Sequence, residues 1–171
     1  TSQMQDKIVF QILQQYARSD MFKRMFVVDN SNIENVYKDI PVVGYYDKLN
    51  EVIVGAIHMI NVFNNTKSVV DTFSAPIDTA RITTFGMVDL ESGEENLFYD
   101  LTSPREKLYY YSITKDRLKS EGSLLKKITN QVKEKLEDEL KVSYGIYSSA
   151  YDHDYVYCVA HATLIQETNL D

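Results

Sequence analysis

The closing segment Tyr155–Gln166 constrains the fold most, because its two alternating faces differ in character. Successive side chains of an extended strand point to opposite sides. One side carries small and apolar residues, namely Val156, Cys158, Ala160, Ala162 and Leu164. The other side carries Tyr155, Tyr157, Val159, His161, Thr163 and Ile165. We therefore expect a strand of a sheet, with a helix packed closely against the face of small residues.

Three segments have the spacing of amphipathic helices, in which apolar residues recur every three or four positions. Ser2–Met25 begins with a capping-box pattern and continues with apolar residues four positions apart. Asn32–Asp39 is a short helix that a following proline ends. Ser123–Leu140 is the clearest helix, because a single apolar stripe runs along an otherwise charged segment.

Turn-like sequences separate the remaining apolar segments, and this pattern predicts β-hairpins. The expected hairpins are Val42–Tyr46 with Val52–Phe63, Arg81–Leu90 with Asn96–Leu101, and Val142–Tyr147 with Tyr155–Gln166. Val52–Phe63 is apolar on both alternating faces, so we expect a central strand that is covered on both sides. Leu108–Ile113 is a further strand, rich in tyrosine, and Asp116–Ser120 forms a helical turn.

These elements predict an α+β fold. Its sheet is mostly antiparallel and built of hairpins, and it packs against an N-terminal helix and one long helix near the C-terminus. The chain has 171 residues and no linker-like stretch. We therefore expect residues 1–171 to form a single α+β domain.

Composition narrows the classes of partner. The net charge of −7 repels phosphate backbones and anionic lipid, so we expect neither nucleic acid nor a membrane as partner. The longest apolar run, Val52–Ile57, is much shorter than a membrane span. The first residues lack the pattern of a secretory leader, and an upstream signal or anchor that was removed stays an open alternative. A soluble protein is expected, in a compartment that the sequence does not specify.

The sharpest candidate for chemistry is His161-Ala162-Thr163-Leu164, because residues 161 and 163 of a strand point the same way. An imidazole and a hydroxyl at this spacing can hold one phosphate group together. The segment resembles one half of the signature of two-histidine phosphoesterases, in which a second motif supplies the other histidine. That second position falls on His58, where Ile60 replaces the required hydroxyl.

Two interpretations of this motif follow. The resemblance implies a phosphodiesterase acting on a nucleotide through His161, Thr163 and His58, and this is one alternative function. The simpler interpretation is that His161 is a structural histidine of a strand, and that the chain has no catalytic residue.

No other cluster indicates a catalytic or metal site. Asp152-His153-Asp154 offers ligand types, but adjacent turn residues rarely converge on one ion. Cys158 is the single cysteine, which excludes an internal disulfide, and we interpret it as a small core residue. The glycines are scattered, so no phosphate-binding loop is present. We therefore expect no metal and no cofactor, and whether the chain is an enzyme stays open, with the balance against it.

Tyrosines are numerous after residue 100. Tyrosine combines a large apolar ring with a hydroxyl and is common in protein interfaces. Either these rings cover the edges of the sheet or they contact other subunits. In the second interpretation the interface residues are Tyr109, Tyr110, Tyr111, Tyr155 and Tyr157.

The order of elements is a helix, hairpins, the helix Ser123–Leu140 and a closing hairpin that ends at Ile165. This order resembles small α+β virion proteins of tailed phages, such as tail-terminator or neck proteins. The resemblance implies a non-enzymatic assembly protein, a homo-oligomeric component of a larger particle such as a phage virion. A third hypothesis is an extracytoplasmic ligand-sensing domain that has lost a membrane anchor.

Overall fold

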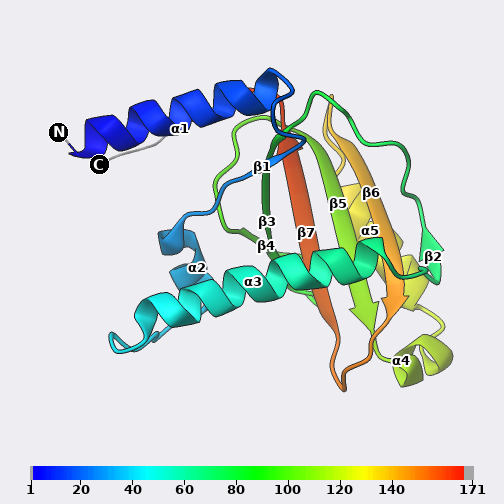
Figure 1. Ribbon diagram of the computed structural model, residues 1–171. Coiled ribbons are helices and arrows are strands. Elements are labelled where there is room, and N and C mark those ends of the chain that lie inside the picture. Colours follow the sequence, from blue (N-terminus) through cyan, green and yellow to red (C-terminus); the bar gives the residue numbers. More distant parts are fainter. Residues whose placement is uncertain (1, 168–171) are drawn as a thin grey trace.

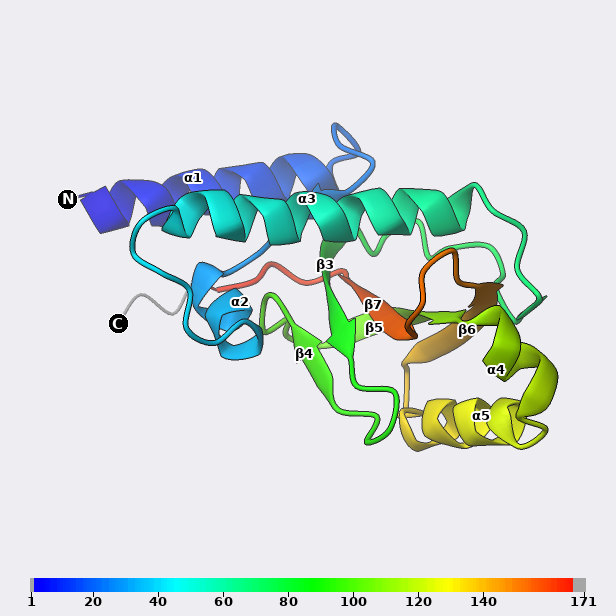
Figure 2. The ribbon, with the colours of Figure 1, turned by 90° about the horizontal axis from the view of Figure 1, so that it is seen from below.

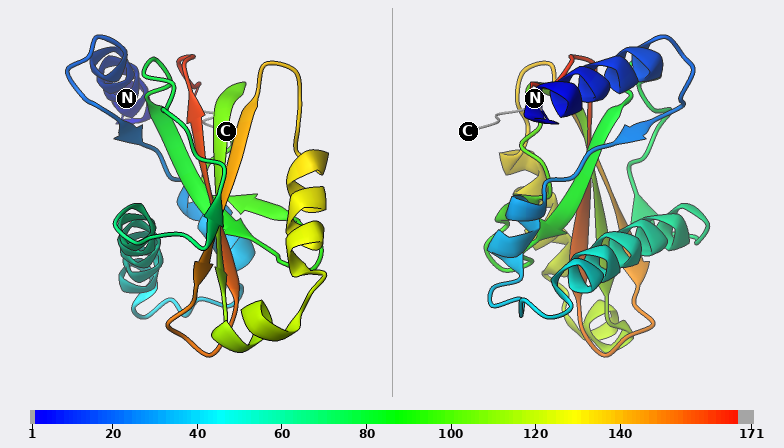
Figure 3. Two further views of the ribbon diagram at one scale, coloured as in Figure 1. Left: turned by 90° about the vertical axis from the view of Figure 1, so that its right-hand side faces the viewer. Right: turned by 60° about the vertical axis from the view of Figure 1, so that its left-hand side comes forward.

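The computed structural model describes residues 2–167 (Figure 1). Its helices are α1 (Ser2–Arg18), α2 (Asn30–Val36), α3 (Tyr45–Asn64), α4 (Lys115–Ser120) and α5 (Leu124–Glu134). Its strands are β1 (Met25–Phe26), β2 (Val70–Asp71), β3 (Ile82–Val88), β4 (Glu95–Leu97), β5 (Pro104–Ile113), β6 (Lys141–Ser148) and β7 (Tyr155–Ala162). Figure 3 shows the sheet edge-on, with α1 and α3 on one side and α5 on the other.

The sheet is mixed, so the prediction of a mostly antiparallel sheet built of hairpins is wrong. Its strand order is β1-β3-β7-β5-β6-β2, and β4 pairs with β3 outside this path. Strand β5 runs parallel to β6, and β1 runs parallel to β3. The reason for the first parallel pair is the connection: α4 and α5 carry the chain back to the level where β5 began, so β6 runs in the same direction.

The hairpin predicted from Val142–Tyr147 and Tyr155–Gln166 is wrong: both segments are strands, β6 and β7, but they do not pair with each other. Strand β5 lies between β6 and β7 and bonds to both. On its other edge, β7 pairs antiparallel with β3 from Val88↔Val156 to Ile82↔Ala162. The strand that the alternation identified is therefore a central strand of the sheet.

The predicted central strand Val52–Phe63 is instead part of helix α3, so its hairpin with Val42–Tyr46 does not exist. Buried residues of α3 recur at helical spacing: Leu49, Ala56, Ile60 and Phe63. Val54, between them, is 64% exposed. A short run rich in Val and Ile fits both the alternation of a strand and the spacing of a helix. Here the segment belongs to a helix of 20 residues, which packs one side against the sheet.

Other local predictions are confirmed with changed boundaries. Strands β3 and β4 form the expected antiparallel pair, and α2, α4 and α5 lie where helices were expected. The first helix ends at Arg18 and not at Met25, because Met25–Phe26 pairs with β3 as strand β1. Helix α5 ends at Glu134, well before Leu140.

Both faces of the sheet are covered, and the core therefore has two layers. One layer packs β5, β6 and β7 against α5, through residues such as Tyr109, Tyr111 and Ile128. The other layer packs the opposite face against α3, through residues such as Tyr110 and Phe63. Adjacent tyrosines of β5 thus alternate between the two layers, and burial on both faces explains why Tyr109, Tyr110 and Tyr111 are all buried.

Helix α1 lies at one end of the sheet, on the same side as α3 but at a different level along the strands (Figure 1 and Figure 2). Its inner contacts are few: Ala17 packs with Val27 and Ile82 in a small separate cluster. The buried amide of Gln14 donates from Nε2 to the carbonyl of Gln166, at 2.9 Å. Within residues 2–167 no helix combines the length and the apolar character needed to cross a bilayer.

Candidate functional site

His161, the leading candidate for chemistry, is only 5% exposed on strand β7. Its Nδ1 lies 2.7 Å from the hydroxyl of Thr83 on the adjacent strand β3. Burial, with a smaller contribution from the nearby Arg24 guanidinium, lowers the pKa of His161 to about 3. The imidazole is therefore neutral near pH 7, and it lacks the acidic second proton of an imidazolium that a histidine general acid donates.

The structure does not bring the two candidate histidines together. His58 is exposed on α3 and lines a cavity of about 370 Å³ beside Tyr155 and Tyr157. His161 lines a different cavity, of about 520 Å³. Thr163 follows the end of β7 and is partly buried. Because Val52–Phe63 is a helix, the second histidine is not on a neighbouring strand, and the two-histidine phosphodiesterase has no support here.

The five tyrosines of the predicted interface fall into two groups. Tyr109, Tyr110 and Tyr111 are buried in the core layers, where they contact this chain and are not accessible to another subunit. Tyr155 and Tyr157 are partly exposed, with ring centroids 5.7 Å apart. A role of these two residues in an interface stays a prediction.

Asp152-His153-Asp154 lies in the loop between β6 and β7. The Asp154 carboxylate accepts the backbone N–H of Thr114 at 2.7 Å and pairs with Arg117 at 2.7 Å. Burial opposes its ionisation, but these two donors outweigh burial and hold the pKa of Asp154 below its usual value. The described part of the chain contains no group of three or more His, Cys, Asp or Glu placed to hold a metal ion.

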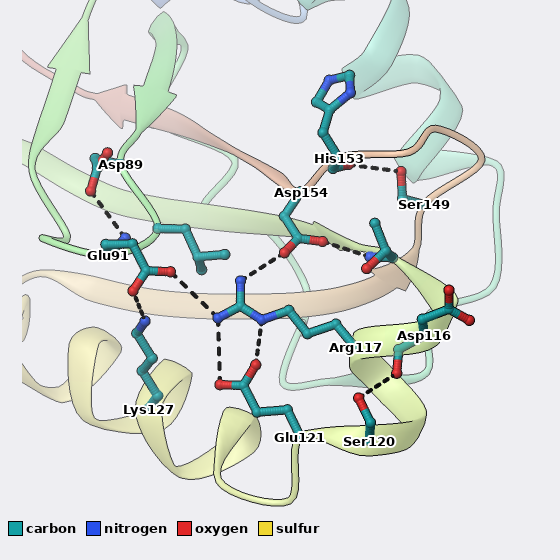
Figure 4. A network of polar contacts seen from close by, with 12 residues as sticks. Asp89, Glu91, Asp116, Arg117, Ser120, Glu121, Lys127, Ser149, His153 and Asp154 are labelled. Atoms are coloured by element: carbon teal, nitrogen blue, oxygen red, sulfur yellow. Dashed lines mark hydrogen bonds and ion pairs between the residues drawn. The ribbon is translucent and has the colours of Figure 1, made fainter.

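Arg117 of α4 is the centre of an ion-pair network that the sequence did not reveal (Figure 4). Its guanidinium contacts the carboxylates of Glu121, Asp154 and Glu91. Glu91 belongs to the turn between β3 and β4, and it also pairs with Lys127 of α5. These pairs join the β3–β4 turn, the consecutive helices α4 and α5, and the β6–β7 loop, and the network explains how α4 is held against the end of the sheet.

A second polar cluster lies beneath α5. The Glu95 carboxylate accepts from Lys107 at 2.9 Å, from Lys135 at 3.0 Å and from the Tyr109 hydroxyl at 2.8 Å. Cys158 is fully buried beside it, and burial together with Glu95 raises the pKa of its thiol well above the usual value. The thiol is therefore protonated and unreactive near pH 7, consistent with a role as a small core residue.

Exposed apolar side chains follow one another along the outer side of α1. We call it the α1 apolar face; its residues, 37% to 69% exposed, are Met4, Ile8, Val9, Ile12, Leu13 and Tyr16. The sequence predicted this helix, but as one whose apolar stripe faces the core. Tyr46 and Val54 of α3 are also exposed, on the same side of the sheet. Contiguous exposed apolar residues are typical of surfaces that contact another protein.

The fold is similar to that of FtsZ and TubZ. A dimer of FtsZ from M. jannaschii matches with a TM-score of 0.58 and 10% identity, over 93% of this chain and 52% of that chain. A helical model of the four-stranded TubZ-Bt filament matches with a TM-score of 0.65 and 16% identity, over 95% and 49%. A GTPγS-form protofilament of TubZ from Bacillus thuringiensis serovar israelensis matches with a TM-score of 0.61 and 15% identity, over 94% and 48%.

This chain thus spans about half the length of the solved chains that it matches. No protein-family model matches the sequence, and no curated protein matches it. The similarity overturns the resemblance to tail-terminator and neck proteins, and with it the prediction of a phage virion component. The hypothesis of a ligand-sensing domain receives no support either. At these identities the comparison establishes the fold, a mixed α/β sheet covered on both faces.

Proposed function

We propose that this chain supplies subunit contacts in a filament-forming protein of the FtsZ and TubZ type. The observation that carries the proposal is the match of at least 93% of the chain to solved FtsZ dimers and TubZ filaments. The proposal keeps the earlier expectation of a homo-oligomer and replaces the virion with a filament.

The α1 apolar face supports this proposal independently of the comparison. Large apolar side chains that stay exposed along a whole helix favour association with another protein surface. The opposite side of the sheet has fewer of them, among which are Leu125 and Leu136. An interface on the side of α1 and α3 therefore agrees best with the distribution of exposed apolar residues.

The proposal assigns guanine-nucleotide binding to the half of the FtsZ and TubZ fold that this chain does not span. The TubZ structures are described as GTPγS and GDP forms. Residues 2–167 contain no glycine-rich loop of the kind that binds phosphate groups through backbone N–H groups. We therefore expect this chain by itself to associate without a need for GTP.

Sedimentation velocity at rising protein concentration, with and without Mg²⁺ and GTPγS, tests the proposal. We expect oligomers whose size grows with concentration and does not depend on the nucleotide. The variant Ile8→Asp/Ile12→Asp places two charges on the α1 apolar face and should shift the protein to the monomer. The matched control is Leu125→Asp, on the opposite side of the sheet, which should associate as the natural chain does.

A natural chain that stays monomeric up to about millimolar concentration contradicts the proposal, since specific self-association is far stronger than this. If both aspartate variants weaken association equally, the assignment of the interface to α1 is wrong. Tight binding of GTPγS to the chain by itself would overturn the division of roles between the two halves of the fold.

A further inference from the structure

A cavity of about 520 Å³ lies between α3 and the sheet. Its walls come from the C-terminal end of α3, from β5, β6 and β7, from the segment that follows α3 and from the α1–β1 connection. This volume is within the range of sites that bind small molecules in proteins. Nothing in the proposed filament contacts uses this cavity.

Aromatic rings form much of the apolar wall. Phe63 and Tyr110 are stacked, with centroids 5.2 Å apart and an interplanar angle of 15°. The ring centroids of Phe73 and Tyr110 are 5.2 Å apart, and those of Tyr147 and Phe63 are 4.9 Å apart. Phe63 and Tyr110 are 3% and 5% exposed, so the partly exposed Phe73 offers the accessible ring of this wall. Aromatic groups pack well in offset-stacked or edge-to-face arrangements, and a flat aromatic ligand can therefore pack against Phe73.

Cationic side chains form the polar part of the lining. Lys23, Arg24 and Lys67 line the cavity, whereas Asp71 is the single acidic lining residue. Asp71 already accepts a hydrogen bond from Ser68. Among the residues described, neither the two lysines nor Arg24 has a carboxylate within 4.0 Å. The lining is thus positive, although the whole chain has a net charge of −7.

Arg24 is the cation best placed to bind an anion, because it is partly buried and held in position. Its Nη1 donates to the carbonyl of Ala80 at 2.6 Å. The nearby Glu106 does not neutralise it directly, since that carboxylate pairs with Lys141 at 3.2 Å and accepts the N–H of Ile77 at 3.2 Å. A partly buried guanidinium without a carboxylate partner is stabilised when an anion binds.

His161 supplies a second polar group to the same cavity. Its Nδ1 is engaged with Thr83, and no hydrogen bond to its Nε2 forms among the residues described. The ring lines the cavity and is near Arg24. An uncharged imidazole beside a guanidinium can bind an acidic group without adding a charge that must itself be neutralised.

We infer that this cavity binds a small aromatic anion, with its ring against Phe73 and its acidic group at Arg24. A planar ring system that carries a carboxylate, sulfonate or phosphate fits this lining, because the ring packs on the aromatic side and the acidic group binds the cationic side. The site is independent of the filament proposal, because it needs only one copy of this chain.

Fluorescence titration with two dyes tests this site. Anilinonaphthalene sulfonate is an aromatic anion, and N-phenylnaphthylamine has the same ring system without the charge. We expect the sulfonate to bind to a single site about tenfold more tightly than the neutral dye, since a hydrogen bond to a charged group contributes about this factor. Its affinity should fall as salt is added.

Variants assign the dye to this cavity. Arg24→Gln should weaken sulfonate binding about tenfold and leave the neutral dye unchanged, and Arg24→Lys should restore part of the loss. Lys67→Gln, at an exposed position that should not affect folding, should weaken the sulfonate by a smaller factor. Lys126→Gln, on the opposite side of the sheet, is the control and should change nothing.

Equal affinity for the two dyes, or sulfonate binding that neither Arg24→Gln nor Lys67→Gln weakens, overturns the inference. A loss of sulfonate binding in Ile8→Asp/Ile12→Asp also overturns it, since the dye would then lie on the α1 apolar face. Thermal unfolding of each variant shows whether the fold is retained. If Arg24→Gln does not fold, Lys67→Gln and the comparison of dyes decide the question.

Discussion

At the scale of single residues, Gly86 shows how closely β3 and β4 approach. A Cβ at this position would lie 2.6 Å from the Cα of Leu97, and still closer to the backbone oxygen of Asn96. These are backbone atoms of a paired strand, so they cannot move aside as a flexible side chain does. Only glycine allows β4 to pair at this point of β3.

We expect Gly86→Ala to lower the free energy of unfolding by about 3 kcal/mol, because the added methyl group forces the two strands apart. Gly55→Ala is the matched control: its Cβ meets open space on helix α3. Alanine in a helix should raise the free energy of unfolding by about 1 kcal/mol. Urea denaturation measures both, and equal effects would contradict the role of Gly86.

His161 makes stability depend on pH in a defined range. Its pKa is about 3 in the folded chain, where burial and Arg24 disfavour the charged form, and its ordinary value is 6.5. Between these values the unfolded chain binds the additional proton, so acid favours unfolding. This contribution is fully present above pH 6.5 and is lost progressively as the pH falls toward 3.

Lowering the pH from 6 to 5 should therefore reduce the free energy of unfolding by about 1 kcal/mol through this one residue. His161→Gln removes the titrating group and should flatten the dependence by that amount, whatever its effect on stability at pH 7. Parallel pH profiles of the two proteins, measured by urea denaturation, would show that His161 is not the cause.

At the scale of elements, helix α1 has few buried contacts with the rest of the described chain. It buries Gln14 and Ala17, and most of its apolar residues are exposed. An isolated helix of this length is marginal in water, so its contacts with the body of the protein matter. Two hydrogen bonds join Gln14 to the backbone of Gln166: its Nε2 donates to the carbonyl, and its Oε1 accepts from the N–H.

Gln14→Ala should lower the free energy for opening α1 by about 1–2 kcal/mol, because both hydrogen bonds to the backbone of Gln166 are lost. Hydrogen exchange of the α1 amides measures this opening. Gln15→Ala changes an exposed neighbour and should leave the exchange unchanged. Equal exchange in the two variants would mean that Gln14 does not hold the helix.

The Arg117 network determines how α4 is attached. Arg117→Lys keeps the positive charge but replaces the planar guanidinium, which contacts Glu121 and Asp154 together, with a single ammonium group. We therefore expect the free energy of unfolding to fall by about 1 kcal/mol. The loss should shrink in high salt, which screens these partly exposed pairs. Urea denaturation at two salt concentrations measures it, with Lys119→Ala on the same helix as the control. A loss that salt does not change would argue against ion pairing.

At the scale of the whole molecule, β5 and β7 are the centre of the structure. Each has a paired strand on both edges, and both faces of the sheet are covered. Residues with such surroundings exchange their amide hydrogens mainly through global unfolding, whereas weakly packed elements open locally.

We therefore expect the slowest hydrogen exchange in Tyr109–Ile113 and in Val156–Ala162, and faster exchange in α1. Exchange followed by mass spectrometry measures this order along the chain at one pH. Protection of α1 equal to that of β7 in the dilute monomer would contradict the two-layer description. Protection of α1 that appears only at high concentration would instead support its role in self-association.

Elements with an unambiguous hydrophobic period were predictable from the sequence. Strand β7, the β3–β4 pair and helices α2, α4 and α5 follow from local alternation or helical spacing. The sequence also indicated that Cys158 packs in the core, where the thiol is indeed buried. These properties depend on residues that are near one another in the sequence, so the local hydrophobic pattern predicts them.

The other features of the fold depend on contacts between segments that are distant in sequence. Val52–Phe63 fits both periods, and only packing against the sheet makes it a helix. Strands β6 and β7 are neighbours in sequence, but β5 separates them because pairing depends on contacts across the whole chain. The distance between His58 and the buried His161, the cations around one cavity and the exposure of α1 follow from that arrangement. These three features depend on contacts between segments that are distant in sequence, so a local hydrophobic pattern cannot predict them.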